Sequence, residues 1–274
     1  MTQERKESYR PETWDEFVKE RPYFPDLMWK WISLTENLLK STQQREGDDL
    51  GFLICGFTAV SIVDLNDILT LSHSNSRSGA PKILRSVYER TVTMKNLASN
   101  PTEVPQFIGY QSVDWEQVIR ECEAKSSAKM SEQSRSNLAA AARDARKDYR
   151  GEVCPHCKMR KQINWTPRPP RELAEIVKLE HMHFFGYIFP SKTMHTTFYG
   201  TMEFMKNTAP LYNILNTAHE LLVQSILIHR RHFAKDCVPT PMMRAAVMDF
   251  RRAWVYAETS FDGLLHEYRP GVFV

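Results

Sequence analysis

Glycine is scarce in this chain, and the signals of a β-protein are missing. Only 10 of the 274 residues are glycine, and no run alternates apolar and polar residues before a hairpin turn. Helical spacing of apolar residues dominates instead, over the ranges 26–41, 48–71, 81–99, 103–123, 213–235 and 240–262. The sequence therefore predicts an all-α fold, a helical bundle with a core of four or five helices.

The chain also lacks a disulfide pattern, and we expect no signal peptide. Its five cysteines are irregularly spaced, which is typical of a protein from the reducing cytoplasm. The N-terminus, MTQERKESYRPETW, has no apolar segment of the kind found in signal peptides. The most apolar run, residues 50–65, stops at Asp64 and is predicted to be too short to span a bilayer and to form a core helix. We expect a cytoplasmic protein with no membrane partner.

Several enzyme signatures are absent as well. The chain contains no P-loop, no GxGxxG, no GxSxG and no HExxH, so nothing indicates a bound nucleotide, an organic cofactor or a catalytic metal. The net charge is only +3. A weakly basic chain permits an RNA or DNA partner without arguing for one.

Changes in composition divide the chain into segments. Residues 1–25, with Pro11, Pro22 and Pro25, are predicted to be an irregular arm, and 26–262 to be one helical domain. Within that domain, residues 124–150 are polar and Ala-rich, which indicates a solvated helical hairpin or arm. A Cys-containing loop follows, so the predicted insert covers about 124–168. Residues 263–274 form a C-terminal tail.

The stretch LRSVYER contains the first candidate site. Arg85 and Glu89 are four residues apart and therefore face the same way on a helix. One interpretation is an exposed ion pair of little energetic weight. The other is a partly buried pair that lines a cleft between helices, which the wide apolar arc of this helix favours because it leaves little solvated surface.

The second candidate lies in GYIFPSKTMHTTFYG, residues 186–200. Tyr187, Ser191 and His195 follow at steps of four and would form one polar ridge on a helix. His195 could act as a general acid or base near neutral pH. The alternative is a core or surface histidine whose hydrogen bonds are satisfied.

The string CPHCK contains Cys154 and Cys157, which make half of a tetrahedral zinc site. His181 and His183 could complete a structural zinc site, as could Cys122 or a second subunit. The alternative is a free or redox-sensitive thiol pair.

The string IHRRHF places Arg230 and Arg231 at a helix end. Cations there complement the helix dipole, and a phosphate-binding patch is the alternative. Lys192, in the segment before His195, is a further cation that could neutralise a phosphate.

Three stretches carry a resemblance to known proteins. They are the helix 50–71 with LRSVYE after it, NWTPRPPRELAEIV, and YIFPSKTMHTT. Over roughly residues 35–230 the chain resembles an uncharacterised family of bacterial helical proteins and, more distantly, the HEPN superfamily. The residues that this resemblance singles out are Arg85, Glu89, Tyr187, Ser191 and His195.

Many HEPN domains are RNA-cleaving toxins and phage-defence effectors, with an Arg a few residues before a His. This chain departs from that pattern, because Lys192 precedes His195 and no Arg occurs between residues 173 and 229. Arg85 would then supply the guanidinium from another helix. The resemblance implies an RNA-directed defence or toxin protein, a metal-independent ribonuclease, with RNA, a second copy or an antitoxin as partner. The alternative is a non-catalytic sensor or scaffold that binds a small molecule, a nucleic acid or a protein.

Overall fold

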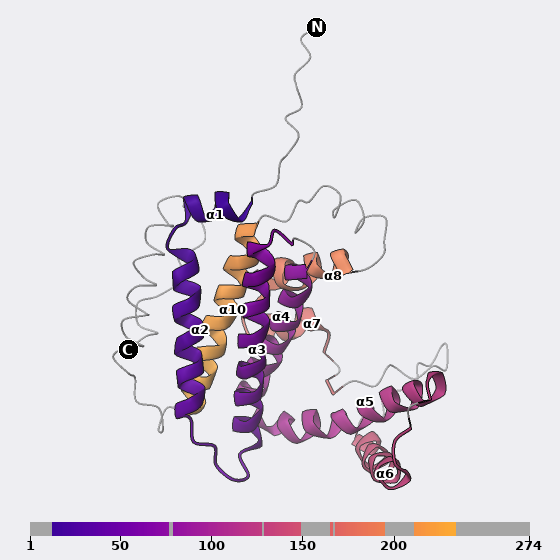
Figure 1. Ribbon diagram of the computed structural model, residues 1–274. Helices are drawn as coiled ribbons and strands as arrows, with labels where there is room; N and C mark the ends of the chain where they lie inside the picture. The colour runs from indigo at the N-terminus through magenta and orange to yellow at the C-terminus, as the bar shows by residue number, and fades with distance from the viewer. Residues whose placement is uncertain are drawn as a thin grey trace. The chain divides into compact units, whose positions relative to one another are not determined.

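The computed structural model describes residues 13–76, 79–127, 129–148, 165–166, 168–194 and 211–233. The regular elements in these ranges are all helical, so the predicted all-α class is confirmed (Figure 1). The longer elements are α2 (Phe24–Ser41), α3 (Asp49–His73), α4 (Gly79–Ser99), α5 (Val104–Lys125), α6 (Glu132–Asp148) and α10 (Leu211–His232). The shorter ones are α1 (Trp14–Glu20), η1 (Pro101–Glu103), α7 (Pro170–Ile176), η2 (Glu180–Met182), η3 (Phe184–Ile188) and α8 (Phe189–Met194).

The chain divides into two compact units. Unit 1 combines Met1–Lys95 with Lys178–Val274, and unit 2 is Asn96–Val177. The second unit therefore begins earlier than the insert expected at about 124, and it includes α5 as well as the polar arm. The physical reason is that α5 has few buried residues, only Val104 and Val113, and packs along α6 of the same unit.

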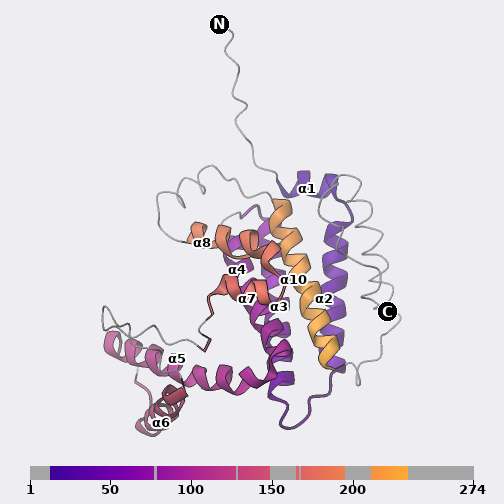
Figure 2. The same cartoon turned by 180° about the vertical axis from the view of Figure 1, so that it is seen from behind.

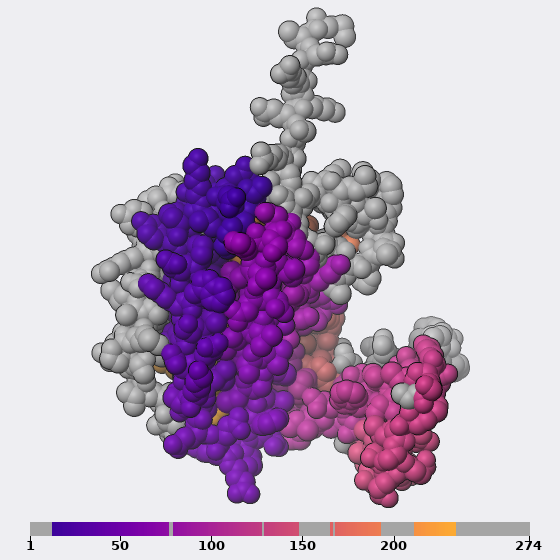
Figure 3. Space-filling view, in the orientation of Figure 1, coloured from indigo at the N-terminus to yellow at the C-terminus, as the bar shows by residue number. Residues whose placement is uncertain are grey.

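Helices α2, α3 and α10 form the centre of unit 1. Helix α10 packs against both α2 and α3, and the three lie side by side in Figures 1 and 2. The buried apolar residues of α10 include Leu215, Ala218, Leu221, Leu222 and Ile226. Figure 3 shows a face of unit 1 whose surface is formed by α2 and α3.

Helix α4 is fixed to α3 by polar contacts. Arg90 forms an ion pair of 2.9 Å with Asp64, and its guanidinium also donates to the hydroxyl of Ser61 at 3.2 Å. Both charged side chains are mostly buried, which makes removal of either partner more costly than at a surface pair. Arg90 thus has a structural role, whereas Arg85 lies elsewhere on the helix.

Helix α3, predicted over residues 48–71, covers Asp49–His73. The run 50–65 was predicted to be too short to cross a membrane. The helix that contains it has 25 residues and, judged by length and composition alone, could cross one. Half of its most apolar window is buried inside the protein. Ile54, Leu65 and Ile68 are fully buried, so the predicted place of this helix in the core is confirmed.

The prediction of an irregular arm over residues 1–25 is wrong for α1 and for the start of α2. The Thr13 hydroxyl accepts from the amide of Glu16, and the Glu16 carboxylate accepts from the amide of Thr13, which is a capping box. Phe17 is fully buried and its ring lies 5.2 Å from that of Phe24. The TxxE spacing was the available signal. Helix α2 begins at Phe24, two residues before the start expected at residue 26.

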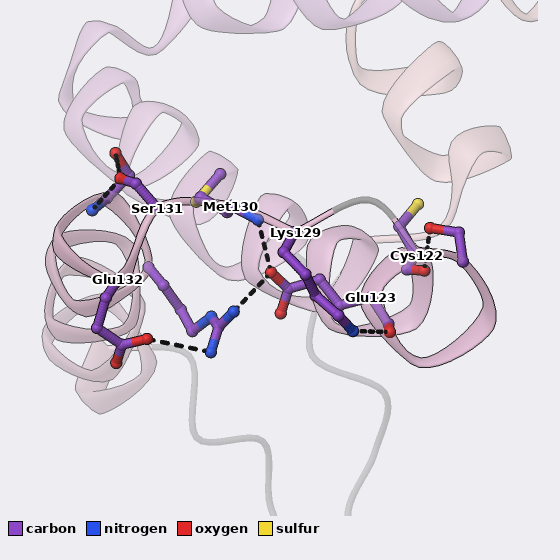
Figure 4. Close-up of polar contacts among 9 residues, drawn as sticks. Cys122, Glu123, Lys129, Met130, Ser131 and Glu132 are labelled. Carbon is purple, nitrogen blue, oxygen red and sulfur yellow. Dashed lines mark hydrogen bonds and ion pairs between the residues drawn. The ribbon is translucent and has the colours of Figure 1, made fainter.

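In unit 2 the described part of the range 124–150, predicted to be a helical hairpin or arm, holds the single helix α6, which forms a hairpin with α5. Its turn, between α5 and α6, is organised around one carboxylate (Figure 4). Glu123 accepts from the backbone amide of Met130 at 2.8 Å and from the guanidinium of Arg135 at 2.8 Å. These contacts fix the direction in which α6 leaves the turn.

Candidate functional site

The predicted pair on α4 is present and partly buried. Nε of Arg85 donates to Oε1 of Glu89 over 3.0 Å, and the two side chains are 21% and 44% exposed. The guanidinium carbon of Arg85 lies 4.7 Å from the centre of the Tyr187 ring. A cation over a tyrosine face is attracted to it, and more strongly when water is partly excluded. Arg85 is thus held by a carboxylate and an aromatic ring, and the structure brings it together with Tyr187.

One turn further along the same face of α4 is Tyr88, which is 1% exposed. Its hydroxyl lies 3.1 Å from Nδ1 of His183 and 3.4 Å from the carbonyl oxygen of Leu179. The His183 ring in turn stacks on Tyr187, with centroids 5.0 Å apart. Burial raises the pKa of Tyr88, and the negative charge of Glu180 raises it further, so the phenol keeps its proton.

The segment that presents His183 and Tyr187 contains a π-helical turn, η3 (Phe184–Ile188). Such turns are rare and often occur at functional sites. Gly186 lies directly against the Tyr88 ring, and a β-carbon there would be 2.5 Å from Cδ2 of Tyr88. The absence of a side chain at position 186 is what allows this close approach. The four residues Arg85, Tyr88, His183 and Tyr187 are called the α4–η3 cluster below.

The other residues of the predicted ridge are placed differently. Ser191, in α8, donates its hydroxyl to the carbonyl of Tyr187, four residues earlier in η3, so its proton is used for local structure. Lys192 is exposed. His195 lies outside the described residues.

A second group of cations lies further along α4 and on neighbouring segments. Nζ of Lys95 donates to Oε1 of Gln224 in α10 over 3.1 Å. Burial lowers the pKa of Lys95, and Arg231 and Lys178 lower it further, whereas Glu180 raises it. Of the two arginines in IHRRHF, Arg231 is the one that interacts electrostatically with Lys95. Arg230 is half-buried.

The proposed zinc ligands have other partners where they are described. His183 contacts Tyr88, and Nε2 of His181 lies 3.6 Å from Oε2 of Glu220, whose hydrogen bond raises the pKa of His181. Cys154 and Cys157 lie outside the described residues, and Cys122 is exposed on α5. The described part of the chain holds no group of three or more His, Cys, Asp or Glu residues arranged to bind a metal.

Sequence reasoning missed Tyr88, Lys95 and Lys178, and it considered His183 only as a zinc ligand. A signal was available for two of them, because residues 85, 88 and 95 recur at helical spacing on one face. Two buried histidines of α10 were also missed. Burial lowers the pKa of His219 to about 3 and that of His229 to about 4.

The comparisons with known proteins agree with the sequence resemblance at the level of family. The model of a family of unknown function (DUF5677) matches residues 51–210. The matched range includes Arg85, Tyr88, Lys95, His183 and Tyr187, and it ends before α10. No curated protein and no solved structure matches the chain.

Proposed function

We propose that this chain, which belongs to that family of unknown function, binds RNA along α4 and cleaves it without a metal. The observation that supports this most is the setting of Arg85, which is stacked on Tyr187, bonded to Glu89 and partly open to solvent. The distant likeness to HEPN ribonucleases points the same way.

Arg85 would bind the scissile phosphate and stabilise the charge that develops on it. A guanidinium is always protonated and has five N–H donors in a rigid fork, which suits two phosphate oxygens at once. Glu89 and Tyr187 would restrict the side chain to one orientation. Donors fixed in place before the reaction contribute more than mobile ones, because they need no reorganisation in the transition state.

Cleavage would use the RNA's own 2′-hydroxyl as nucleophile. The 2′-oxygen forms a bond to phosphorus, the bond from phosphorus to the 5′-oxygen breaks, and the product is a 2′,3′-cyclic phosphate. A histidine takes the 2′-hydroxyl proton, and the leaving 5′-oxygen receives a proton. His195 is the predicted residue for this exchange. His183, whose Nδ1 contacts the Tyr88 hydroxyl, is the histidine next to Arg85's stacking partner.

The test is cleavage of labelled RNA by the purified full chain in EDTA. We expect a cyclic-phosphate product, a loss of roughly 100-fold or more in rate for Arg85→Gln, and partial activity for Arg85→Lys. His195→Ala and His183→Gln identify which histidine moves the proton. The matched control is Arg171→Gln, because Arg171 and Glu175 form an exposed ion pair with the same spacing and the same 3.0 Å distance. A 5′-phosphate product with a strict magnesium requirement would refute the mechanism.

One observation favours a second function, a non-catalytic sensor or scaffold. Tyr88 and His183 are 1% and 8% exposed and contact each other, as expected of a closed network that orders the core. The α4–η3 cluster would then position Arg85 for a small anionic ligand or a partner protein. In that case Arg85→Gln would abolish binding, and wild-type protein would leave RNA intact.

A further inference from the structure

The contacts of the α4–η3 cluster form a series that begins at buried side chains and ends at a partly exposed one. Tyr88 and His183 are buried, and Tyr187 is half-buried. The side chains of Arg85 and its partner Glu89 are more open to solvent. The Tyr187 ring contacts both the His183 ring and the guanidinium of Arg85. Tyr187 therefore links the buried end of the series to the cation.

Tyr88 is the buried end of this series. Its hydroxyl lies 3.1 Å from Nδ1 of His183 and 3.4 Å from the carbonyl oxygen of Leu179. A phenol both donates and accepts, so it can donate to a bare Nδ1 and can accept from a protonated one. The contact with His183 is thus available whether the imidazole is neutral or charged. Such a contact suits a residue that fixes a ring in place.

The ring of His183 needs a contact of this kind to fix its plane. The torsion that turns a histidine or tyrosine ring has broad wells, so the rotamer alone does not determine the plane. The bond to Nδ1 restricts the His183 ring, and Tyr187 stacks on it with an angle of 14° between the planes. A fixed plane at His183 therefore also fixes the plane at Tyr187.

Arg85 is the exposed end of the series. Its guanidinium carbon lies 4.7 Å from the centre of the Tyr187 ring, and its Nε donates to Glu89 at 3.0 Å. A cation is attracted to the face of an aromatic ring, so turning the ring would weaken this contact. A partly exposed ion pair by itself holds a long side chain only weakly. The orientation of Arg85 therefore depends on Tyr187 as well as on Glu89.

We propose that Tyr88 and His183 are positioning residues for Arg85. Their hydrogen bond holds the Tyr187 ring in the plane on which the guanidinium stacks. His183 acts through Tyr187 and exchanges no proton with the RNA, which leaves that step to another histidine. Functional side chains have to be held within about 0.5 Å by residues that are themselves fixed, and buried neighbours supply this. The inference rests on the proposed function only for the identity of the ligand as RNA.

The first measurement needs no RNA. Nitrogen-15 NMR of the full chain observes arginine Nε–H groups, and the signal missing from Arg85→Lys belongs to Arg85. Tyr88→Phe removes only the hydroxyl. His183→Gln keeps groups that can bond Tyr88 but loses the ring that stacks on Tyr187. In both variants we expect the Arg85 signal to shift toward that of an unstacked arginine, with Nε–H exchange about three- to tenfold faster.

Tyr212→Phe is the matched control, because it also removes a hydroxyl from a half-buried ring beside an arginine. The Tyr212 ring centre lies 4.5 Å from the guanidinium carbon of Arg21. This variant should leave the Arg85 signal unchanged. An equal shift of that signal in Tyr212→Phe would overturn the proposal, because the effect would then not come from the Tyr88–His183 contact.

A double-mutant cycle tests whether Tyr88 acts through Arg85. The ligand is a 2′-O-methyl oligouridylate, which lacks the nucleophile and cannot be cleaved. Tyr88→Phe should weaken its binding about three- to tenfold, as for the loss of one hydrogen bond. In the Arg85→Gln background, Tyr88→Phe should have no further effect, because residues that act as one unit are not additive. In the cleavage assay, Tyr88→Phe and His183→Gln should lower kcat by a similar factor at every pH.

The outcomes separate this inference from the proposed function. An Arg85 signal that stays unmoved in both variants overturns it, as do additive losses in the double variant or a pH profile that changes with His183→Gln. If the signal moves as expected but the wild type neither binds nor cleaves RNA, the positioning role stands and the proposed function fails. His183→Gln keeps the NMR test valid if Tyr88→Phe does not fold.

Discussion

At position 186 a β-carbon would lie 2.5 Å from Cδ2 and 2.8 Å from Cγ of Tyr88, and both atoms belong to a fully buried ring. Gly186→Ala should therefore displace Tyr88 from His183 and lower the free energy of unfolding by about 1–3 kcal/mol, the usual range for overpacking. Urea denaturation followed by circular dichroism measures this change.

Gly56→Ala is the matched control for that substitution. Nothing lies within 4 Å of a β-carbon at position 56, in the middle of α3. Alanine is preferred over glycine inside a helix by about 0.5–1 kcal/mol, so this variant should be at least as stable as the wild type. If Gly186→Ala and Gly56→Ala proved equally stable, the lack of a side chain at position 186 would not be what allows η3 to pack closely against Tyr88.

Residue-scale chemistry was predictable only where it is local. The Arg85–Glu89 contact follows from a spacing of four on a helix, and the structure has it at 3.0 Å. The contact between Tyr88 and His183 joins residues 95 positions apart, and no periodicity in either segment indicates it. Ser191 was assigned to a polar ridge from spacing alone, but the same spacing places the Tyr187 carbonyl within reach of its hydroxyl.

At the scale of elements, Glu123 ties the end of α5 to the start of α6 (Figure 4). Glu123→Gln keeps the shape but loses the charge that Arg135 bonds. We expect amide exchange in the first turns of α6 to become roughly 3- to 10-fold faster, as for loss of one or two hydrogen bonds. Hydrogen exchange with peptide resolution measures the change.

Glu132→Gln provides the comparison within the same turn, since Glu132 bonds the other branch of the Arg135 guanidinium but is 86% exposed. Exposed pairs contribute little, so exchange in α6 should stay close to that of the wild type. The same acceleration in both variants would show that charge alone, and not the Glu123 contacts, holds the turn.

Long helices were predictable as elements, and short ones were not. Helices α2 and α10 show several turns of apolar periodicity and α3 a long apolar run, which predict that these helices exist but leave their ends uncertain by a few residues. Helix α1 has seven residues, and its only strong signal is the capping box at Thr13. The π-helical turn η3 departs from the 3.6-residue period, so a pattern search based on that period cannot find it.

At the scale of the whole molecule, the bundle of unit 1 has neutral histidines in its core. His219 is fully buried, and its ring makes T-shaped contacts with the rings of Phe24 and Trp31. His229 is buried against Cys55 and Thr42, and the neighbouring His232 pairs with Asp48 at 2.7 Å. Burial lowers both pKa values, to about 3 for His219 and about 4 for His229, where the positive charge of His232 also contributes.

A histidine whose pKa is lower in the folded state binds a proton more readily when the chain unfolds. The stability it provides is therefore complete above pH 6.5 and is lost as the pH falls from 6.5 toward the folded pKa. When the pH falls from 7 to 5, protonation of each of these two histidines on unfolding should lower the free energy of unfolding by about 2 kcal/mol. His181 has the opposite sign, because its raised pKa gives stability that is present below pH 6.5 and lost at higher pH.

His219→Leu tests this assignment, because leucine fills an apolar site and cannot be protonated. The difference in unfolding free energy between pH 7 and pH 5 should shrink by about 2 kcal/mol in this variant, whatever its stability at pH 7. His181→Gln should leave or enlarge that difference, since it removes a group that favours the folded state at low pH. Urea midpoints at both pH values supply the numbers. If His219→Leu loses as much stability as the wild type between pH 7 and pH 5, the protons are taken up by other groups of the bundle and not by His219.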